Sequence, residues 1–203
     1  MYLTNGNPCL ERRNARLSKM TEEQKASLMQ LKESATLGFV VLKRTRREKK
    51  VGDVFVCSVQ EGVYYYGRIL KVNVKQEWFT TKGCLVVCLY KERTNKKTMD
   101  DFKGDINNLM FDPEIVFPQY WSNGYFETIG NVPLTKEEEE LDYGFWKQKI
   151  LKKEGYFVKE DDTYMDHAPK YFNMMGVTLY WGFYENIKEA IIVDPSLAIV
   201  KNN

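Results

Sequence analysis

The segment of residues 49–74 places the strongest constraint on the fold of this chain. It contains two runs rich in β-branched and aromatic residues, 54–59 and 63–74, joined by the short link Gln60-Glu61-Gly62. A short link that contains glycine between two such runs predicts a β-hairpin. Gly67 lies inside the second run and predicts a bulge or bend there, as in a small curled barrel.

The composition is that of an ordinary globular protein. The chain has 203 residues, of which 43% are hydrophobic and 29% are charged, as expected for one sizeable core with or without an appended arm. Its 30 basic and 28 acidic residues nearly balance, so the overall charge gives no argument for nucleic-acid or membrane binding. We find neither a membrane-spanning run nor a secretory signal, and we therefore expect a cytoplasmic protein.

The residues that usually carry catalysis or bind metals are few. Of the four cysteines, Cys84 and Cys88 share one face of a predicted strand and Cys57 lies in another, so we expect buried free thiols. The single histidine, His167, lies in a loop without a nucleophile motif beside it, and we expect it at the surface. The sequence also has no glycine-rich phosphate loop. It therefore predicts neither an enzyme nor a bound metal or cofactor.

A capping signal predicts one helix in the first part of the chain. Thr21 followed by Gln24 matches the pattern in which the Thr side chain caps a helix and Gln reaches back to it. An apolar stripe follows, so we expect a helix over residues 21–35. The first 20 residues are expected to be loosely structured.

A similar signal appears in the second half of the chain. Thr135 and Glu138 form a capping pattern, and the stretch after them is acidic at its start and basic at its end, as the helix macrodipole favours. A second helix is therefore expected near residues 136–153. Three apolar runs predict further strands, at 84–90, 115–117 and 125–129.

Residues 43–50 form a strongly basic run, with six Lys or Arg residues among eight. One interpretation is a patch that binds phosphates. The other is a solvated connector that protects a strand edge from unwanted pairing. Because the net charge of the whole chain is only +2, the second interpretation is favoured.

Three segments of the chain resemble a known family. Residues 50–55, KVGDVF, and residues 64–70, YYYGRIL, are similar to the strand pair that opens the immunity protein 26 family of bacterial polymorphic toxin systems. Residues 129–134, IGNVPL, resemble a later segment of that family, so the similarity covers residues 49–135. The resemblance implies a protein that binds and neutralises a cognate toxin domain without catalysis.

The resemblance also suggests which residues would contact a toxin. An inhibitor of this kind needs a rigid scaffold with aromatic anchors on its surface. Four aromatic residues near predicted strand edges or loops are candidates: Tyr64, Tyr66, Trp78 and Phe79. An acidic segment would cover a basic, nuclease-like cleft of the toxin, and its candidate residues are Glu160, Asp161 and Asp162.

Two alternatives remain open. Ribonuclease toxins with small SH3-like barrels also begin with a "GD-V" strand, but they carry an Arg-Pro pair that holds the scissile phosphate, whereas here Arg68 is followed by Ile69. A barrel that binds RNA is the other alternative, with Tyr64, Tyr66 and Arg68 as a stacking platform beside the basic run. Neighbouring tyrosines in a strand more often line a core edge or a protein interface, so RNA binding is less favoured.

Together these observations predict an α+β protein. We expect a strongly bent antiparallel sheet, SH3-like or a small barrel, flanked by helices. Residues 1–47 are expected to form an N-terminal helical arm and basic connector. Residues 48–203 are expected to form a β-rich immunity domain with a helical and β C-terminal extension packed on it. The expected partner is the cognate toxin domain, and we expect neither a membrane nor a nucleic acid as a partner.

Overall fold

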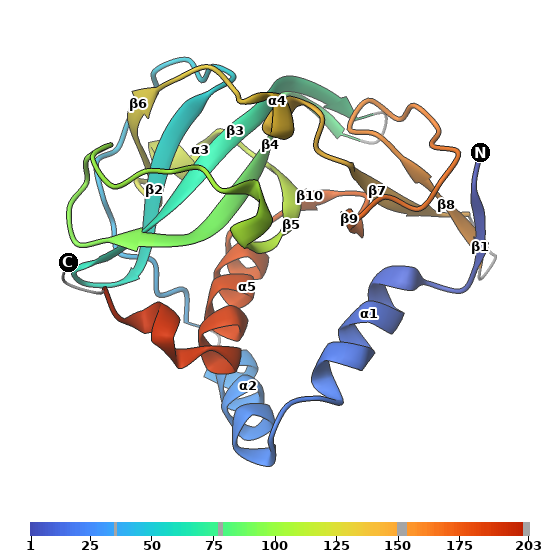
Figure 1. Cartoon of the computed structure of the whole chain (residues 1–203), viewed down its shortest axis with the longest axis horizontal. Helices are drawn as coiled ribbons and strands as arrows, with labels where there is room; N and C mark the ends of the chain where they lie inside the picture. The colour runs from blue at the N-terminus through green and yellow to red at the C-terminus, as the bar shows by residue number, and fades with distance from the viewer. Residues whose placement is uncertain (35, 77–78, 150–153, 201–203) are drawn as a thin grey trace.

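The fold combines two β-sheets with five α-helices within the described part of the chain, which confirms the α+β class. The computed structural model describes residues 1–34, 36–76, 79–149 and 154–200. Figure 1 shows the larger sheet at the left, the smaller sheet at the right and the long helices below them. The helices and 3-10 turns are α1 (Pro8–Leu17), α2 (Glu22–Ser34), η1 (Ile106–Asn108), α3 (Gln119–Ser122), α4 (Lys136–Glu139), α5 (Tyr180–Val193) and η2 (Pro195–Ala198).

The larger sheet has six strands in the order β10-β5-β4-β3-β2-β6. Neighbouring strands are antiparallel, except that β10 runs parallel to β5. Within the described residues the outer strands β10 and β6 do not pair with each other, so the sheet is open and the expectation of a small barrel is not confirmed. The strands are β2 (Asp53–Gln60), β3 (Val63–Gln76), β4 (Phe79–Thr94), β5 (Leu109–Val116), β6 (Phe126–Asn131) and β10 (Val177–Thr178).

The predicted hairpin is confirmed and lies within this sheet. Strands β2 and β3 pair antiparallel, with Phe55 opposite Gly67. A Cβ atom added to Gly67 would lie 2.2 Å from Cζ of Phe55, so the Phe55 ring occupies the space over the glycine. The pairing of β3 with β4 also shifts register between Tyr65 and Gly67, which confirms the irregularity predicted at this position.

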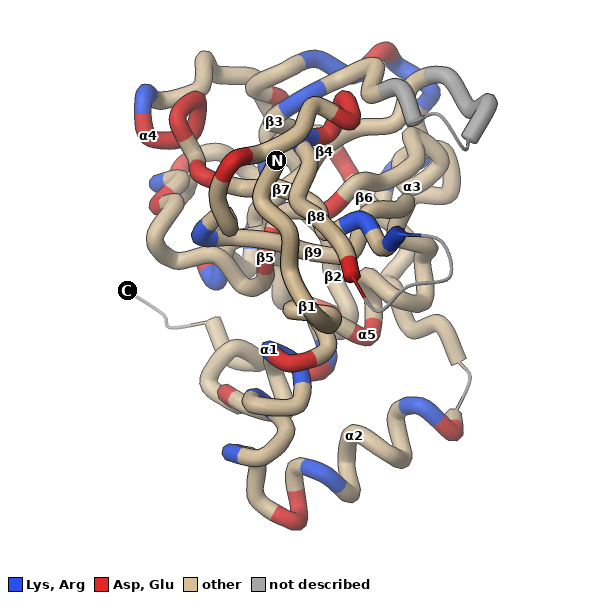
Figure 2. Tube along the Cα trace, turned by 90° about the vertical axis from the view of Figure 1, so that its right-hand side faces the viewer, with Lys and Arg blue, Asp and Glu red and all other residues tan. Residues whose placement is uncertain are grey.

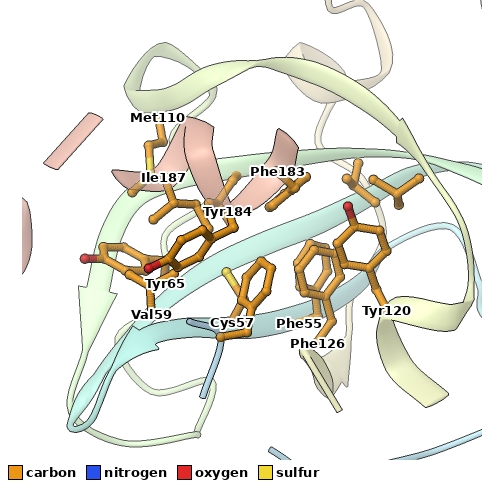
Figure 3. Packing of buried hydrophobic residues seen from close by; sticks show 14 of the residues in the cluster. Phe55, Cys57, Val59, Tyr65, Met110, Tyr120, Phe126, Phe183, Tyr184 and Ile187 are labelled. Atoms are coloured by element: carbon orange, nitrogen blue, oxygen red, sulfur yellow. The ribbon is translucent and has the colours of Figure 1, made fainter. Parts of the chain in front are cut away.

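Helices α5 and α3 cover one face of the six-stranded sheet (Figure 1). In Figure 3, Phe183 and Ile187 of α5 lie over Phe55 and the neighbouring side chains of the sheet. The ring of Phe55 stacks on that of Phe126, with centroids 4.5 Å apart. Burying one side chain of this size stabilises the fold by about 1.5–3 kcal/mol, so this face contributes much of the driving force for folding.

The second sheet covers the opposite face of the larger one. Tyr143 and Phe145 of this sheet share a core with Val54 and Val86 of the larger sheet. The protein therefore has three layers, with the six-stranded sheet in the middle (Figure 1). The strand order is β1-β8-β7-β9, and the strands are β1 (Leu3–Asn5), β7 (Tyr143–Gln148), β8 (Glu154–Val158) and β9 (Tyr171–Met174).

The expected helix near residues 136–153 is wrong over most of its length. Thr135 caps a helix as predicted, but α4 is a single turn and the chain then enters β7. In β7 the side chains alternate, with Tyr143 and Phe145 in the core under the larger sheet and Trp146 in a separate cluster. This period of two buries aromatic rings on both faces of the strand. That burial outweighs the few tenths of a kcal/mol that favourable charge at helix ends provides.

The predicted helix in the N-terminal arm is confirmed as α2. The N–H of Thr21 donates to Oε1 of Gln24 (3.0 Å), and the N–H of Gln24 donates to Oγ1 of Thr21 (3.2 Å), which is the predicted capping box. The expectation that residues 1–20 are loosely structured is wrong, because β1 and α1 lie there and β1 pairs with β8. No described helix is long and apolar enough to cross a membrane.

Helix α1 contacts the rest of the protein mainly through charged side chains. It has no buried residue. Arg12 pairs with Asp112 of β5 (Nη1 to Oδ2, 2.6 Å), and Arg16 pairs with Glu189 of α5 (Nη2 to Oε1, 3.1 Å). Figure 2 shows α1 and α2 below the two sheets, with basic and acidic residues along both helices. The division into an arm of residues 1–47 and a domain of residues 48–203 stays a prediction.

The expectation of buried free thiols is confirmed for three of the four cysteines. Cys57 lies in the core under α5, and Cys84 and Cys88 lie in the core between the sheets. Burial raises the pKa of Cys88 to about 12, so the thiol stays protonated at neutral pH. The described residues hold no group of three or more His, Cys, Asp or Glu side chains that could bind a metal.

Candidate functional site

The three segments that carry the family resemblance meet where β2 begins and β6 ends. Asp53, the first residue of β2, is fully buried. Its Oδ1 accepts a hydrogen bond from Nδ2 of Asn131 (2.8 Å), and its Oδ2 accepts one from the N–H of Lys50 (3.1 Å). Nη2 of Arg47 also lies 3.4 Å from Oδ1. These donors offset the cost of burying a carboxylate, so Asp53 ties the entry of β2 to the end of β6.

Gly52 makes a close approach in the same place. A Cβ atom at this position would lie 2.3 Å from the carbonyl oxygen of Val132. The N–H of Val132 donates to the carbonyl oxygen of Gly52 (3.1 Å), and φ of Gly52 is 81°, a conformation that only glycine adopts readily. The backbones of the first and third segments therefore touch directly.

Arg68, from the second segment, joins the third segment from inside the protein. Only 1% of this residue is exposed. Its Nη2 donates to the carbonyl oxygens of Val132 (3.0 Å) and Pro133 (2.5 Å) and lies 3.2 Å from Oε2 of Glu138. The guanidinium carbon is 5.5 Å from the ring centre of Phe102. The charge of Arg68 is thus balanced by acceptors that the segment after β6 provides.

Glu138 completes the buried cluster. Its Oε1 accepts a hydrogen bond from the hydroxyl of Tyr90 (2.7 Å), and its Oε2 accepts one from the N–H of Thr135 (2.8 Å). Burial, the neighbouring Cys88 thiol and the carboxylate of Glu138 raise the pKa of Tyr90, so the phenol remains a donor. The single turn α4 is therefore capped at its start and fixed to β3 and β4 by one side chain.

This cluster lies inside the scaffold and holds its segments together. Asp53, Arg68 and Glu138 are all buried, and their carboxylate and guanidinium groups face one another or the backbone. The RNA-binding alternative required Tyr66 and Arg68 in an accessible stacking platform. The prediction of this platform is wrong, because both residues are buried and the hydroxyl of Tyr66 donates to the carbonyl oxygen of Thr98 (2.9 Å).

The sequence profile of immunity protein 26 matches residues 50–156. The chain belongs to the immunity protein 26 family. No curated protein and no solved structure matches the chain. In this immunity protein 26 chain, the matched segment starts where β2 is about to begin and stops inside β8, so it contains all four members of the buried cluster, Asp53, Arg68, Tyr90 and Glu138.

The four aromatic residues predicted to contact a toxin have different surroundings in this family member. Tyr64 is half-buried in β3, opposite Thr94 of β4. Tyr66 is fully buried, so it supports the sheet from inside and is not available as a surface anchor. Phe79 is the first residue of β4, and Trp78 lies outside the described residues.

The predicted acidic segment follows β8 and has partners within the protein. The hydroxyl of Tyr143 donates to Oε2 of Glu160 (2.8 Å), and Nζ of Lys147 pairs with Oδ1 of Asp162 (2.7 Å). Only Asp161 is exposed, and its Oδ1 accepts a hydrogen bond from the N–H of Thr163 (3.0 Å). A hydrogen bond from the Thr163 side chain, together with this backbone hydrogen bond, lowers the pKa of Asp161. Most of the acidic charge is therefore used to fix the loop.

The start of β3, which contains Tyr64, and the acidic segment lie at opposite sides of the molecule (Figure 1). Tyr64 follows the β2–β3 turn, where Nε2 of Gln60 donates to the carbonyl oxygen of Ala198 (2.7 Å) near the C-terminal end. The loop of residues 159–170 lies at the opposite side of the molecule, in orange at the upper right of Figure 1. Besides the family-like segments that contain Asp53 and Arg68, the Thr135 capping pattern was a sequence signal that pointed toward the buried cluster. It indicated that Glu138 turns inward to the backbone, but not that Arg68 and Tyr90 lie beside it.

The single histidine is exposed, as expected. Its ring nitrogens lie 2.8 Å from Oδ1 of Asp166 and 2.9 Å from Oδ1 of Asp142. Hydrogen bonds to these two carboxylates raise the pKa of His167. His167 thus links the loop after β8 to the segment just before β7. Both of its partners are carboxylates, and neither is the hydroxyl or thiol that nucleophilic catalysis needs.

A polar cleft of about 990 Å³ lies between the loop after β4 and η2. Charged side chains of both signs line it, and none of its lining residues is His or Cys. Two of these side chains hold backbone in place: Glu92 accepts hydrogen bonds from the N–H groups of Lys103 (2.9 Å) and Asp105 (3.0 Å), and Arg93 donates to the carbonyl oxygens of Ser196 (2.7 Å) and Ile199 (2.6 Å). Glu92 and Arg93 thus fix two neighbouring segments of the chain to the end of β4.

Proposed function

We propose that this protein is an immunity protein that binds a cognate bacterial toxin domain and neutralises it by occupying it, without chemistry of its own. The observation that carries the proposal is family membership across residues 50–156. The buried cluster supports it, because an inhibitor needs a rigid scaffold and Asp53, Arg68 and Glu138 fix the connections of the main sheet. We place the protein in the cytoplasm, where the toxin would otherwise act.

Co-expression tests this function directly. The toxin domain to use is the variable C-terminal domain of a large secreted protein encoded beside this chain. We expect that domain alone to stop growth, and the chain to restore growth and to co-elute with the domain on a sizing column. Restored growth without a complex would contradict neutralisation by binding. So would an enzymatic activity of the purified chain, if a single side-chain change abolished that activity.

We also propose contacts for this complex. The proposed direct contacts are Tyr64 and Asp161, which are accessible, together with Trp78 and Phe79; Tyr66, whose side chain is buried, is left out of the proposal. Glu160 and Asp162 would act indirectly, by fixing the loop that carries Asp161. Replacing Tyr64 by Ala should raise the dissociation rate of the toxin domain about tenfold or more if its ring is an anchor. An unchanged rate would remove this residue from the interface.

A further inference from the structure

The basic run of the sequence is exposed in the structure. We call residues 43–50 the basic strap. Five of its cations are exposed, and the strap contains one acidic residue, Glu48. The exposed cations are Lys43, Arg44, Arg46, Arg47 and Lys50. In Figure 1 the segment between α2 and β2 that contains the strap runs beside the six-stranded sheet without forming a helix or a strand.

The backbone on either side of these cations is fixed. The N–H of Leu42 donates to the carbonyl oxygen of Gly124 (2.7 Å), and the N–H of Thr45 donates to that of Trp121 (3.0 Å). At the other end, the N–H of Lys50 donates to the buried carboxylate of Asp53 (3.1 Å). The strap is therefore ordered before any partner binds, so binding costs less conformational entropy.

Most of the cations are unpaired. Among the described residues, Lys43, Arg44, Arg46 and Lys50 form no ion pair, and Arg47, which pairs with Asp53, still has 59% of its side chain exposed. The acidic segment differs from the strap, because Glu160 and Asp162 have internal partners. The charge that the strap leaves available for recognition is therefore positive.

We infer that the basic strap docks onto a carboxylate-rich face of the toxin domain. This inference rests on the proposed function and adds the charge of the surface that the toxin must present. Guanidinium groups bind carboxylates through paired hydrogen bonds, and a row of fixed cations steers an acidic surface into place.

The surroundings of the strap favour a protein over a single-stranded nucleic acid. Proteins that bind single strands stack bases on exposed aromatic rings. The ring beneath the strap belongs to Trp121, which is fully buried and lies 5.2 Å from Nζ of Lys49. Tyr125, in the next turn of chain, stacks on Phe39 with ring centroids 5.0 Å apart. The Trp121 ring, which contacts the strap, is thus part of the core, and one face of the Tyr125 ring is covered by Phe39.

Two triple variants with the same net charge test the inference. The strap variant is K43Q/R44Q/R46Q, and the control variant is K19Q/K103Q/K136Q, whose three lysines are exposed on other elements. Neither variant changes the backbone donors that fix the strap, so we expect equal thermal unfolding midpoints. The probes are the toxin domain encoded beside the chain, poly-L-glutamate, and single-stranded and duplex DNA oligonucleotides.

We expect the strap variant to associate with the toxin domain at least about tenfold more slowly than the wild type at low ionic strength, and the control variant to stay within about twofold. The difference should shrink in about 0.5 M salt, where the Debye length is only a few ångströms. Poly-L-glutamate should lose affinity for the strap variant only. Equal loss in both variants would overturn the inference and leave the strap as a connector that guards the sheet.

The other outcomes are also decisive. Oligonucleotide binding that exceeds poly-L-glutamate binding and depends on the strap would overturn the inference and assign the strap to nucleic acid. If the wild type fails to bind or neutralise the toxin domain, the proposed function fails. In that case the poly-L-glutamate comparison still decides whether the strap recognises carboxylates. If the strap variant kept its affinity for poly-L-glutamate, the inference about the strap would be rejected.

Discussion

Nη2 of Arg68 lies 3.2 Å from Oε2 of Glu138, and no more than 2% of either side chain is exposed to solvent. The two residues come from distant parts of the chain: Arg68 lies in β3, and Glu138 lies in the single turn α4, shortly after the third family-like segment. Burying such a pair costs desolvation energy, so the pair itself adds little net stability, but removing one partner leaves a buried charge without compensation.

The first prediction follows from this pair. Replacing Glu138 by Ala should lower the free energy of unfolding by about 3–5 kcal/mol, because Arg68 and the Tyr90 hydroxyl lose their acceptor inside the protein. Urea unfolding monitored by tryptophan fluorescence measures the change. Glu139→Ala, an exposed neighbour in the same turn, is the matched control and should change stability by less than about 0.5 kcal/mol. Similar values for the two variants would refute the role assigned to Glu138.

The second prediction concerns the glycine under the Phe55 ring. Gly67→Ala would place Cβ 2.2 Å from Cζ of Phe55, so we expect a loss of about 1–3 kcal/mol from overpacking. Combining it with Phe55→Leu, which frees space, should give a double variant more stable than the sum of the two single changes predicts. Gly182→Ala on α5 has only one contact, at 3.4 Å, and should be neutral or slightly stabilising. Additive values in the double variant would contradict direct packing.

The third prediction is a pH dependence. Burial raises the pKa of Glu114 to about 7, although Thr178, Asn186 and Asn173 hydrogen-bond to it. Because the folded protein binds this proton more tightly than the unfolded chain, the contribution of Glu114 to stability is fully present below pH 4.5 and is lost as the pH rises toward 7. The loss should be on the order of 1–3 kcal/mol.

Comparing Glu114→Gln with the wild type isolates this contribution. The difference in unfolding free energy between the two proteins should change in favour of the Gln variant as the pH rises from 5 to 8. Glu137→Gln, at an exposed site, should leave the pH profile unchanged. A difference that stays constant with pH would show that Glu114 titrates as in the unfolded chain.

The fourth prediction concerns helix α1. Since this helix has no buried residue and is held by pairs such as Arg12 to Asp112, we expect its amide hydrogens to exchange much faster than those of β3. About 0.5 M salt should speed the exchange of α1 further and leave β3 unaffected, because exposed ion pairs are screened. Hydrogen exchange read by mass spectrometry makes the comparison. Equal protection of α1 and β3 would mean that unrecognised packing holds the helix.

Local signals predicted the local structure well. The link before Val63 predicted the hairpin, Gly67 predicted the irregularity in its second strand, and Thr21 with Gln24 predicted the start of α2. These predictions held because turns, bulges and caps depend on residues close in sequence. The region after Thr135 failed for a different reason. Its charge pattern suited a long helix, but the aromatic side chains of β7 bury more surface as a strand packed under the larger sheet.

The site was harder to predict than the fold elements. Nothing near Arg68 in the sequence marks it as the partner of Glu138, because their contact depends on how β6 and the following turn return to β3. Tyr66 and Tyr64 are neighbours in one strand, yet one is buried and the other half-exposed. Both side chains lie on the same face of β3, so the difference depends on how far along that face the covering residues extend, and several of these come from beyond residue 140.

Helix α5 follows all six strands of the larger sheet along the chain, yet it covers one of the two faces of that sheet. On the ribosome, the strands will therefore emerge with Phe55 and Phe126 bare until Phe183 and Ile187 have been translated. We expect the nascent chain to be prone to aggregation during this interval. Partial translation products that lack α5 therefore leave this face of the sheet uncovered.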